Sequence, residues 1–245
     1  HADLVVKALK AGKHVFVEKP LAVNGAQLSV INKQLKAENC PLIAVGFNRR
    51  FSPLAQQLHA SLITRHEPLH AHYRINAGYL PLNHWTQDEQ LGGGRIIGEA
   101  CHFIDLLTFL VGTAPVSVTA HALPNNGKYR EDNVSMTFTF PDGSIGVVDY
   151  LANGDKSFPK ERLEVFCEGM IAVLDDYVSL VNVKDGKKKV ETMAQDKGWK
   201  AELTAFAAAI KSGGEAPIPY EQLIGVTKST FAAVESMRKH QSIEI

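Results

Sequence analysis

The chain has 245 residues, of which 45% are hydrophobic and 21% are charged, a composition typical of a globular protein. Its 26 Lys and Arg balance its 26 Asp and Glu, so charge gives no reason to expect a nucleic acid or a membrane surface as partner. The three cysteines, Cys40, Cys101 and Cys167, are too few and too widely spaced for a disulfide framework or a zinc knuckle. No apolar run reaches the length of a membrane span, and reduced thiols lead us to expect a cytoplasmic protein.

The first 47 residues predict a piece of a parallel sheet. The chain opens as a helix already under way and without an initiator Met, so we infer that residues precede His1 in the natural protein. A strand is expected at 14–18, a helix at about 24–38 and a second strand at 42–46. A strand–helix–strand unit of this length is typical of a βαβ crossover, which predicts the back portion of a doubly wound parallel sheet.

The remainder, residues 48–245, predicts a second domain of mixed character. Strand candidates follow one another at short spacing between about 116 and 183, with a further strand at 69–76. Hairpin signals at Pro141-Asp-Gly143 and Asp185-Gly186 favour an antiparallel arrangement. Helices are expected at about 53–65, 95–111, 197–211 and 220–240. The fold class is therefore α/β, with a large, mainly antiparallel sheet that helices cover on one face. Its open face favours a homo-oligomer.

Glu18 and Lys19 form the first candidate site. They emerge where the strand at 14–18 meets Pro20, and doubly wound sheets bind ligands at the carboxyl ends of their strands. A lysine at this place could orient a substrate hydroxyl or lower its pKa through its charge. The alternative is a solvated strand end without a function.

Three glycines, Gly92 to Gly94, precede a helix that carries the second candidate site. Within this helix Glu99, His102 and Asp105 are spaced three apart, so we expect them on one face. A histidine between carboxylates suits general acid–base chemistry, because a carboxylate fixes its tautomer and tunes its pKa. The alternative is a core or capping histidine with solvated acids.

Arg49 and Arg50, in the segment Gly46 to Pro53, form a third candidate site at the expected domain junction. Two arginines at a strand end can bind a carboxylate, a phosphate or a ribose, although a structural role is the alternative. His70 and His72 share one side of a strand, but the sequence offers no third ligand of suitable spacing, and we expect no metal.

In this order, the three segments resemble the Gfo/Idh/MocA (glucose–fructose oxidoreductase/inositol dehydrogenase) family over essentially the whole chain. The resemblance lies in Ala8-Leu-Lys-Ala-Gly-Lys-His-Val-Phe-Val-Glu-Lys-Pro-Leu21, in Val45-Gly-Phe-Asn-Arg-Arg-Phe-Ser-Pro53, and in the glycine-rich turn with its helix. It implies that residues 1–47 are the C-terminal part of a Rossmann domain. Residues 48–245 would then be the family's α/β substrate and oligomerisation domain.

The resemblance also implies a chemistry: NAD or NADP as cofactor, and reversible oxidation of a secondary alcohol on a small sugar-like substrate. By this likeness Lys19, with Glu18 and Pro20, lies beside the nicotinamide, and His102 is the proton acceptor. Glu99 or Asp105 would orient His102, and the region of Arg49 and Arg50 would contribute to the cofactor site. The alternatives are a non-catalytic sugar-binding or regulatory module and an imine or enamine reductase.

Two departures from the family pattern stand out. The glycine-rich dinucleotide fingerprint is absent, so this sequence does not distinguish NAD from NADP. Many relatives also carry an Asp four residues before the histidine, whereas this chain has Gly98 there. Glu99, the next residue, is the candidate to replace that carboxylate.

Overall fold

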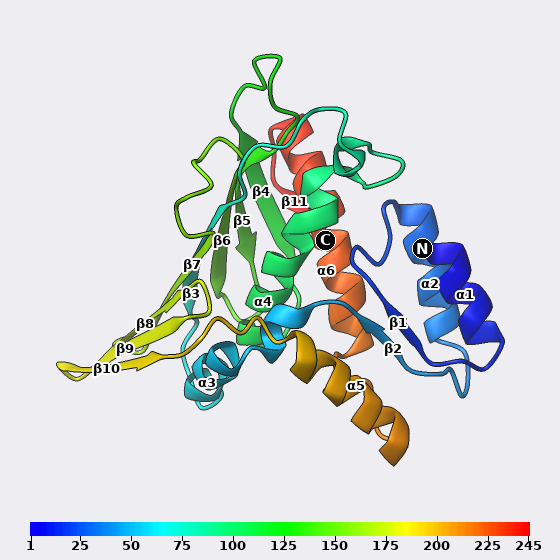
Figure 1. Ribbon diagram of the computed structural model, residues 1–245, viewed down its shortest axis with the longest axis horizontal. Helices are drawn as coiled ribbons and strands as arrows, with labels where there is room; N and C mark the ends of the chain where they lie inside the picture. Colours follow the sequence, from blue (N-terminus) through cyan, green and yellow to red (C-terminus); the bar gives the residue numbers. More distant parts are fainter.

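A computed structural model describes residues 1–245. Its first part is a small lobe of two helices and two strands at one side of the molecule (Figure 1), built from α1 (Ala2–Lys10), β1 (Val15–Val17), α2 (Gly25–Leu35) and β2 (Ile43–Val45). The two strands pair in parallel, with Val15 opposite Ile43 and Val17 opposite Val45. The helix α2 begins at Asn24, whose side chain accepts a hydrogen bond from the backbone of Gln27. The predicted strand–helix–strand unit is thus present.

The rest of the chain is organised around one sheet of nine strands, in the order β10-β9-β8-β7-β3-β6-β5-β4-β11. Only β3 and β6 are parallel neighbours, and every other pair is antiparallel. The strands are β3 (His70–Asn76), β4 (Ser117–Ala122), β5 (Asn133–Thr139), β6 (Ile145–Leu151), β7 (Glu161–Cys167), β8 (Met170–Asp175), β9 (Ser179–Lys184), β10 (Lys187–Thr192) and β11 (Ile243–Glu244).

Two of these strands, β10 and β11, are not among the strands predicted from the sequence. The strand β10 lies at the sheet edge and begins with three lysines, so it has no apolar alternation to reveal it. The turn before it was recognisable, because Asp185 and Gly186 both adopt the positive φ angles that a two-residue hairpin requires. The strand β11 has only two residues, too few for any periodicity.

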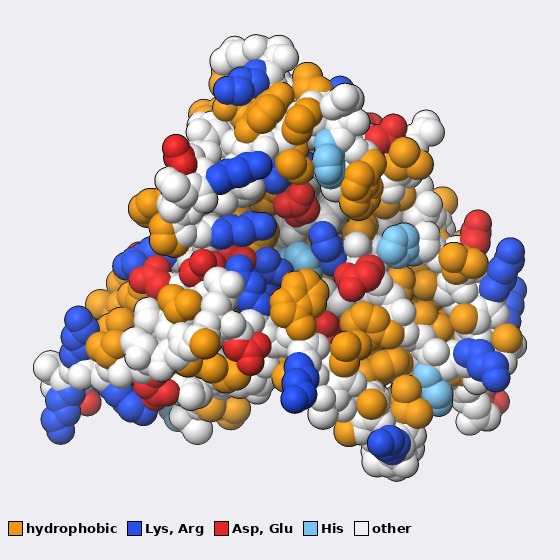
Figure 2. Space-filling model, viewed as in Figure 1, with side chains coloured by type: hydrophobic (Ala, Val, Ile, Leu, Met, Phe, Trp, Pro, Cys, Tyr) orange, Lys and Arg blue, Asp and Glu red, His pale blue; other side chains and the backbone are white.

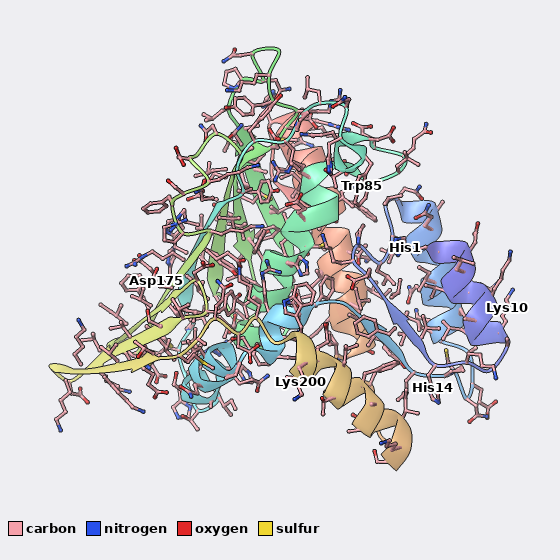
Figure 3. All side chains as sticks on the ribbon, in the orientation of Figure 1. His1, Lys10, His14, Trp85, Asp175 and Lys200 are labelled. Carbon is pink, nitrogen blue, oxygen red and sulfur yellow. The ribbon has the colours of Figure 1, made fainter.

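Helices lie on one face of the sheet. The remaining elements are α3 (Pro53–Leu62), α4 (Cys101–Val111), α5 (Trp199–Ser212), α6 (Tyr220–Lys239) and the short helical turns η1 (Asn48–Phe51), η2 (Trp85–Gln87) and η3 (Ile96–Ala100). Figure 1 shows α4 and α6 side by side between the sheet and the small lobe. Figure 3 shows His1, Lys10 and His14 on the small lobe and Asp175 on the sheet at the opposite side. No helix is long and apolar enough to cross a membrane.

The sheet face that the helices leave uncovered remains partly apolar. Along β5, residues Val134, Met136 and Phe138 point to the helices and are buried, while the residues between them are exposed. On the open face, Phe166 and Ile171 are 43% and 39% exposed. The predicted one-sided covering of the sheet is therefore present, together with an open face that mixes apolar and charged side chains.

The predicted helix at 95–111 is not uniform. Its first turn, η3, is a π-helix from Ile96 to Ala100, and only from Cys101 does a regular α-helix begin. Gly98 lies inside this wide turn, where a Cβ atom would come within 2.7 Å of the Gly92 carbonyl oxygen. The close approach of the glycine-rich turn therefore requires glycine at this position. Single π turns occur often at functional sites, and this one lies directly before His102.

Candidate active site

Lys19 joins the small lobe to the helices of the main domain. It follows β1 directly, and its Nζ donates a hydrogen bond of 3.0 Å to the carbonyl oxygen of Gly98. Gly98 lies in η3, the turn directly before α4. Residues 79 positions apart in sequence thus bring the first and second predicted segments together. The lysine at the carboxyl end of a parallel strand lies where doubly wound sheets bind their ligands.

His102 lies in the first turn of α4 and is 7% exposed. Its ring packs edge-on against Phe47, with 6.1 Å between the ring centroids. Burial lowers the pKa of His102 well below its ordinary value, and the positive charges of Arg49 and Lys19 lower it further. Its buried Nδ1 has no hydrogen-bond partner in the chain. His102 is therefore a neutral imidazole at pH 7 with free capacity to take up a proton.

Glu99 does not orient His102. Its carboxylate accepts hydrogen bonds from the Tyr150 hydroxyl at 2.6 Å and from Arg95 at 3.3 and 3.4 Å. Burial raises the pKa of Glu99, but the charge of Arg95 and the hydrogen bond from Tyr150 outweigh it, and the pKa is lowered overall. Glu99 is thus an ionised carboxylate with its own partners, and the prediction that it holds His102 is wrong.

Asp105 does not orient His102 either. It is fully buried and forms a two-pronged ion pair with Arg50, at 2.9 Å from Nε and 2.5 Å from Nη2. The structure therefore does not place Asp105 as a partner of His102, because both of its carboxylate oxygens bind Arg50, and a catalytic role for Asp105 stays a prediction. The three-residue spacing placed Asp105 near His102 along the helix, but the approach of η1 decided which group it pairs with.

The side chains of Arg49 and Arg50 likewise form ion pairs with carboxylates of the protein itself. Arg49 forms two hydrogen bonds with Glu161, of 2.8 and 2.9 Å, and Lys197 donates a third to the same carboxylate at 2.9 Å. Both guanidiniums are nearly inaccessible, with Arg50 held by Asp105. The structure places both arginines in ion pairs within the protein, which is the structural alternative, and their assignment to the cofactor stays a prediction. Arg49 still acts on the site at a distance, through its effect on the pKa of His102.

Glu18 and Pro20 flank Lys19 at the mouth of the β1–β2 pair. Glu18 is exposed, and its carboxylate lies against Gly46, where a Cβ atom would meet its Oε2 at 2.8 Å. Pro20 is half-buried. The carboxyl ends of both parallel strands therefore meet at one place, with a glycine that leaves room for the Glu18 side chain.

Gly98 explains how the site differs from the usual family pattern. Lys19 binds a backbone carbonyl at this position, and the Gly92 carbonyl fills the space that a side chain on residue 98 would need. A carboxylate four residues before His102 would therefore displace the glycine-rich turn. In this chain the partner of Lys19 is a peptide oxygen, and Glu99 points to Tyr150 instead.

Two residues near the site were not singled out in the sequence. Tyr150 on β6 is fully buried and holds Glu99. Lys160, in the turn before β7, is half-buried, and its charge contributes to the lowered pKa of His102. The sequence carries no signal for Lys160, because a lysine between Pro159 and Glu161 in a polar turn is typical of any surface loop.

The structure gathers no cluster of three or more His, Cys, Asp and Glu side chains that could hold a metal ion. His72, of the histidine pair on β3, is hydrogen-bonded to Asp149 at 2.6 Å.

The pKa of Glu202 on α5 gives a test of how burial and nearby charges act beside the site. It is 3% exposed, and its Oε1 has no partner. Burial, followed by the charges of Glu18 and Asp105, raises the pKa of Glu202 to about 8. Since the unfolded chain loses this proton near the ordinary value of 4.5, the stability contributed by the neutral acid declines as pH rises towards 8. We expect Glu202→Gln to raise the free energy of unfolding at pH 9 on the order of 2 kcal/mol.

Urea denaturation at pH 5 and pH 9 measures this gain, which should almost vanish at pH 5. Glu215→Gln, at an exposed site in the turn before α6, is the matched control. An equal effect of Glu202→Gln at both pH values would contradict a raised pKa for Glu202.

Comparison with known proteins places this fold and site in a family. Residues 1–47 match the family model of the oxidoreductase family with an NAD-binding Rossmann fold, and residues 63–172 match the model of the GFO/IDH/MocA C-terminal domain. Together the two matched ranges cover more than half of the chain.

Curated proteins of similar sequence support the same family. Inositol 2-dehydrogenase 2 of Saccharopolyspora erythraea is 34% identical over 153 residues, which cover 60% of this chain and 42% of that protein. Inositol 2-dehydrogenase of Rhizobium meliloti is 25% identical, over 100% of this chain and 77% of that protein. The chain thus matches less than half of the first relative and about three quarters of the second.

The solved structures show the same fold. Levoglucosan dehydrogenase, in complex with NADH and levoglucosan, superposes with a TM-score of 0.82 at 22% identity, covering 100% of this chain and 77% of that one. With both family models matched in the expected order and the fold reproduced over the whole length, the chain belongs to the Gfo/Idh/MocA family of oxidoreductases.

Proposed function

We propose that the protein is an NAD(P)-dependent dehydrogenase acting on a secondary alcohol of a sugar, polyol or activated sugar. One observation carries the proposal: the Lys19–Gly98 hydrogen bond holds the lysine of the small lobe against the helix of the neutral, unpaired His102. The names of the relatives, inositol and levoglucosan dehydrogenases, support this substrate class.

The residues of this chain fit the reacting end of such a cofactor. Glu18, Lys19 and Pro20 line the carboxyl end of β1, next to the carboxyl end of β2, and His102 brings a buried nitrogen without a partner. Arg49 and Arg50 are occupied and do not contribute. When bound, NAD or NADP accepts or supplies the hydride.

Lys19 and His102 provide the stabilisation of charge and the proton transfer that the reaction also needs. Lys19 hydrogen-bonds the substrate oxygen and stabilises the negative charge that develops on it as the hydroxyl proton departs. The neutral imidazole of His102 takes that proton at a ring nitrogen and returns it in the reverse direction. Glu99 and Asp105 do not take part in the proton transfer. Glu99 holds Tyr150 and Arg95, and Asp105 holds Arg50, so both acids act on the site only through these partners.

Nicotinamide fluorescence tests the function directly. Titration of the full-length protein with NADH and NADPH is expected to show saturable binding of one or both, followed by oxidation of a sugar or polyol in a substrate screen. A protein that binds neither nucleotide would support a non-catalytic sugar-binding or regulatory module. Turnover of imines but not of alcohols would identify an imine or enamine reductase.

The acid side of the pH profile is a further prediction. The base must be neutral to act, and the pKa of His102 lies well below its ordinary value of 6.5. We therefore expect kcat/KM for alcohol oxidation to rise with pH on a limb centred below pH 6.5 and to lose that limb in His102→Asn. Initial rates between pH 5 and pH 8 measure it. A limb centred at or above 6.5 in the wild type would show that the buried environment of His102 does not govern the reaction.

We also propose that the open sheet face joins two copies of the chain. Apolar side chains on β6, β7 and β8, namely Ile145, Phe166 and Ile171, remain 39–43% exposed there. Phe166→Glu is expected to shift the protein to a smaller assembly in sedimentation velocity, because it buries a charge in the contact. Leu4→Glu on α1, at a more exposed apolar site away from the sheet, is the control. An unchanged assembly in Phe166→Glu would place the contact elsewhere.

The division of the chain at residues 47 and 48 is likewise a proposal. It is supported by the separate two-stranded sheet and by the end of the Rossmann match at residue 47.

A further inference from the structure

Lys160 carries a positive charge that nothing in the chain neutralises by direct contact. Its ammonium makes neither a hydrogen bond nor an ion pair, although the residue is half-buried. Two neighbouring cations, Lys197 and Arg49, are paired. Lys197 contacts Glu161 and Asp176 at 2.9 and 3.3 Å, and Arg49 is bound to Glu161. Lys160 therefore differs from the structural cations around it, since its charge remains available to a ligand.

The backbone holds Lys160 in place. Its carbonyl oxygen accepts hydrogen bonds from the backbone of Asn76 at 2.8 Å and from the Arg74 guanidinium at 3.3 Å. The same guanidinium binds the Pro159 carbonyl at 2.7 Å. These contacts tie the turn to β3 at the centre of the sheet, so the lysine is presented from a fixed base rather than from a free loop.

A cavity of about 530 Å³ opens beside this lysine. Lys156, Lys160, Ser157 and Asn76 contribute to its wall, and its one acid, Asp176, already receives Lys197. The cavity is therefore positively charged on balance. Figure 2 shows Lys and Arg side chains gathered with a few acids near the middle of the visible face.

The same lysine lies close to the site along the chain and through its neighbours: it directly precedes Glu161, which binds Arg49, and the Arg49 guanidinium lies over the ring of Phe103, the residue after His102. The charge of Lys160 contributes to the lowered pKa of His102, and the charge of Glu99 acts on Lys160 in turn. Burial lowers the pKa of Lys160 itself, which shows that the unpaired ammonium is held at a cost in free energy. A ligand anion would remove that cost, whereas a neutral hydroxyl would not.

We propose that Lys160 forms an anion subsite next to His102, and that the sugar substrate carries an acidic group, a carboxylate or a phosphate, which this ammonium binds. The inference rests on the proposed dehydrogenase function and narrows its substrate to acidic sugars.

The test compares matched sugars on the full-length protein: hexuronates, hexose phosphates and the corresponding neutral hexoses. We expect the wild type to favour an acidic sugar at least tenfold in kcat/KM, a factor equivalent to about 1.4 kcal/mol. Lys160→Gln is expected to raise KM for that acidic sugar about 10- to 100-fold, a larger change than for neutral sugars, for which only the altered charge near His102 matters. Lys160→Arg should retain the preference, and Lys187→Gln, at the exposed start of β10, is the matched control.

Preference for hexuronates would identify a carboxylate, and preference for hexose phosphates a phosphate.

A binding measurement keeps this inference separate from the proposed function. Calorimetric titration with the same sugars does not depend on turnover, and acidic sugars should bind to the wild type and much more weakly to Lys160→Gln. If no alcohol is oxidised but this difference in binding is found, the dehydrogenase function fails and the anion subsite stands. Equal binding and turnover of acidic and neutral sugars, or an equal loss on all substrates in Lys160→Gln, would overturn the subsite.

Discussion

Lys19→Ala is expected to lower kcat for alcohol oxidation by about 10²- to 10³-fold, because it removes a preorganised donor that stabilises charge on the reacting oxygen. The fold should survive the change. Lys19 is half-buried, and its side chain makes a single hydrogen bond, to Gly98, whose loss costs only about 1 kcal/mol. Steady-state rates with a saturating sugar, together with the urea midpoint, separate the two effects.

Two variants sharpen this test. Lys13→Ala removes an exposed lysine just before β1 and should leave turnover unchanged. Lys19→Arg keeps the charge but has a planar, bulkier head, so we expect only part of the activity to return. Undiminished turnover in Lys19→Ala would remove this lysine from the mechanism, whereas unfolding of the variant would show that the Lys19–Gly98 contact is mainly structural.

Glu161→Gln is expected to lower the free energy of unfolding by roughly 3–5 kcal/mol, as is found when one partner of a buried ion pair is removed. Glu161 is 1% exposed and binds Arg49 and Lys197, and the Tyr73 hydroxyl also donates to it. Without the carboxylate, Arg49 stays buried with no anion paired to it, and Lys197 keeps only Asp176. Guanidinium or urea denaturation at pH 7 measures the loss.

The pH dependence of the wild type gives an independent check. Burial raises the pKa of Glu161, but the charge and hydrogen bonds of Arg49 outweigh it and hold the pKa at about 2, below its ordinary 4.5. The stability from this carboxylate is therefore present above pH 4.5 and is lost as pH falls towards 2. The double variant Arg49→Met/Glu161→Leu removes both charges and should cost less than Glu161→Gln alone. A cost below about 1 kcal/mol for the single variant would contradict a network that depends on Glu161.

The buried ion pairs contain three of the predicted site residues, Arg49, Arg50 and Asp105. Arg49 and Glu161 are 112 residues apart, and Arg50 and Asp105 are 55 apart. A local pattern shows that a charged residue lies at a strand end or on a helix face. It does not show which opposite charge the fold will bring to it, so a structural pair and a ligand-binding group look alike in sequence.

The sequence alone determined the local architecture and pointed to Lys19 and His102 as the two candidate reacting residues. Apolar periodicity within single elements is a physical consequence of burial on one face, so β1, α2, β2 and most of the nine-stranded sheet could be predicted. The motif around Lys19 and the helix position of His102 also indicated the family, which the comparisons confirm.

Only the tertiary structure decided how those residues are surrounded. It gave Lys19 the Gly98 carbonyl as partner, brought Glu99 in the π turn to Tyr150, and left the Lys160 ammonium unpaired at the wall of a cavity. Each of these depends on contacts between elements far apart in the chain. Hydrogen bonds and ion pairs depend on distance and direction in space, which residue spacing fixes only within one helix or strand.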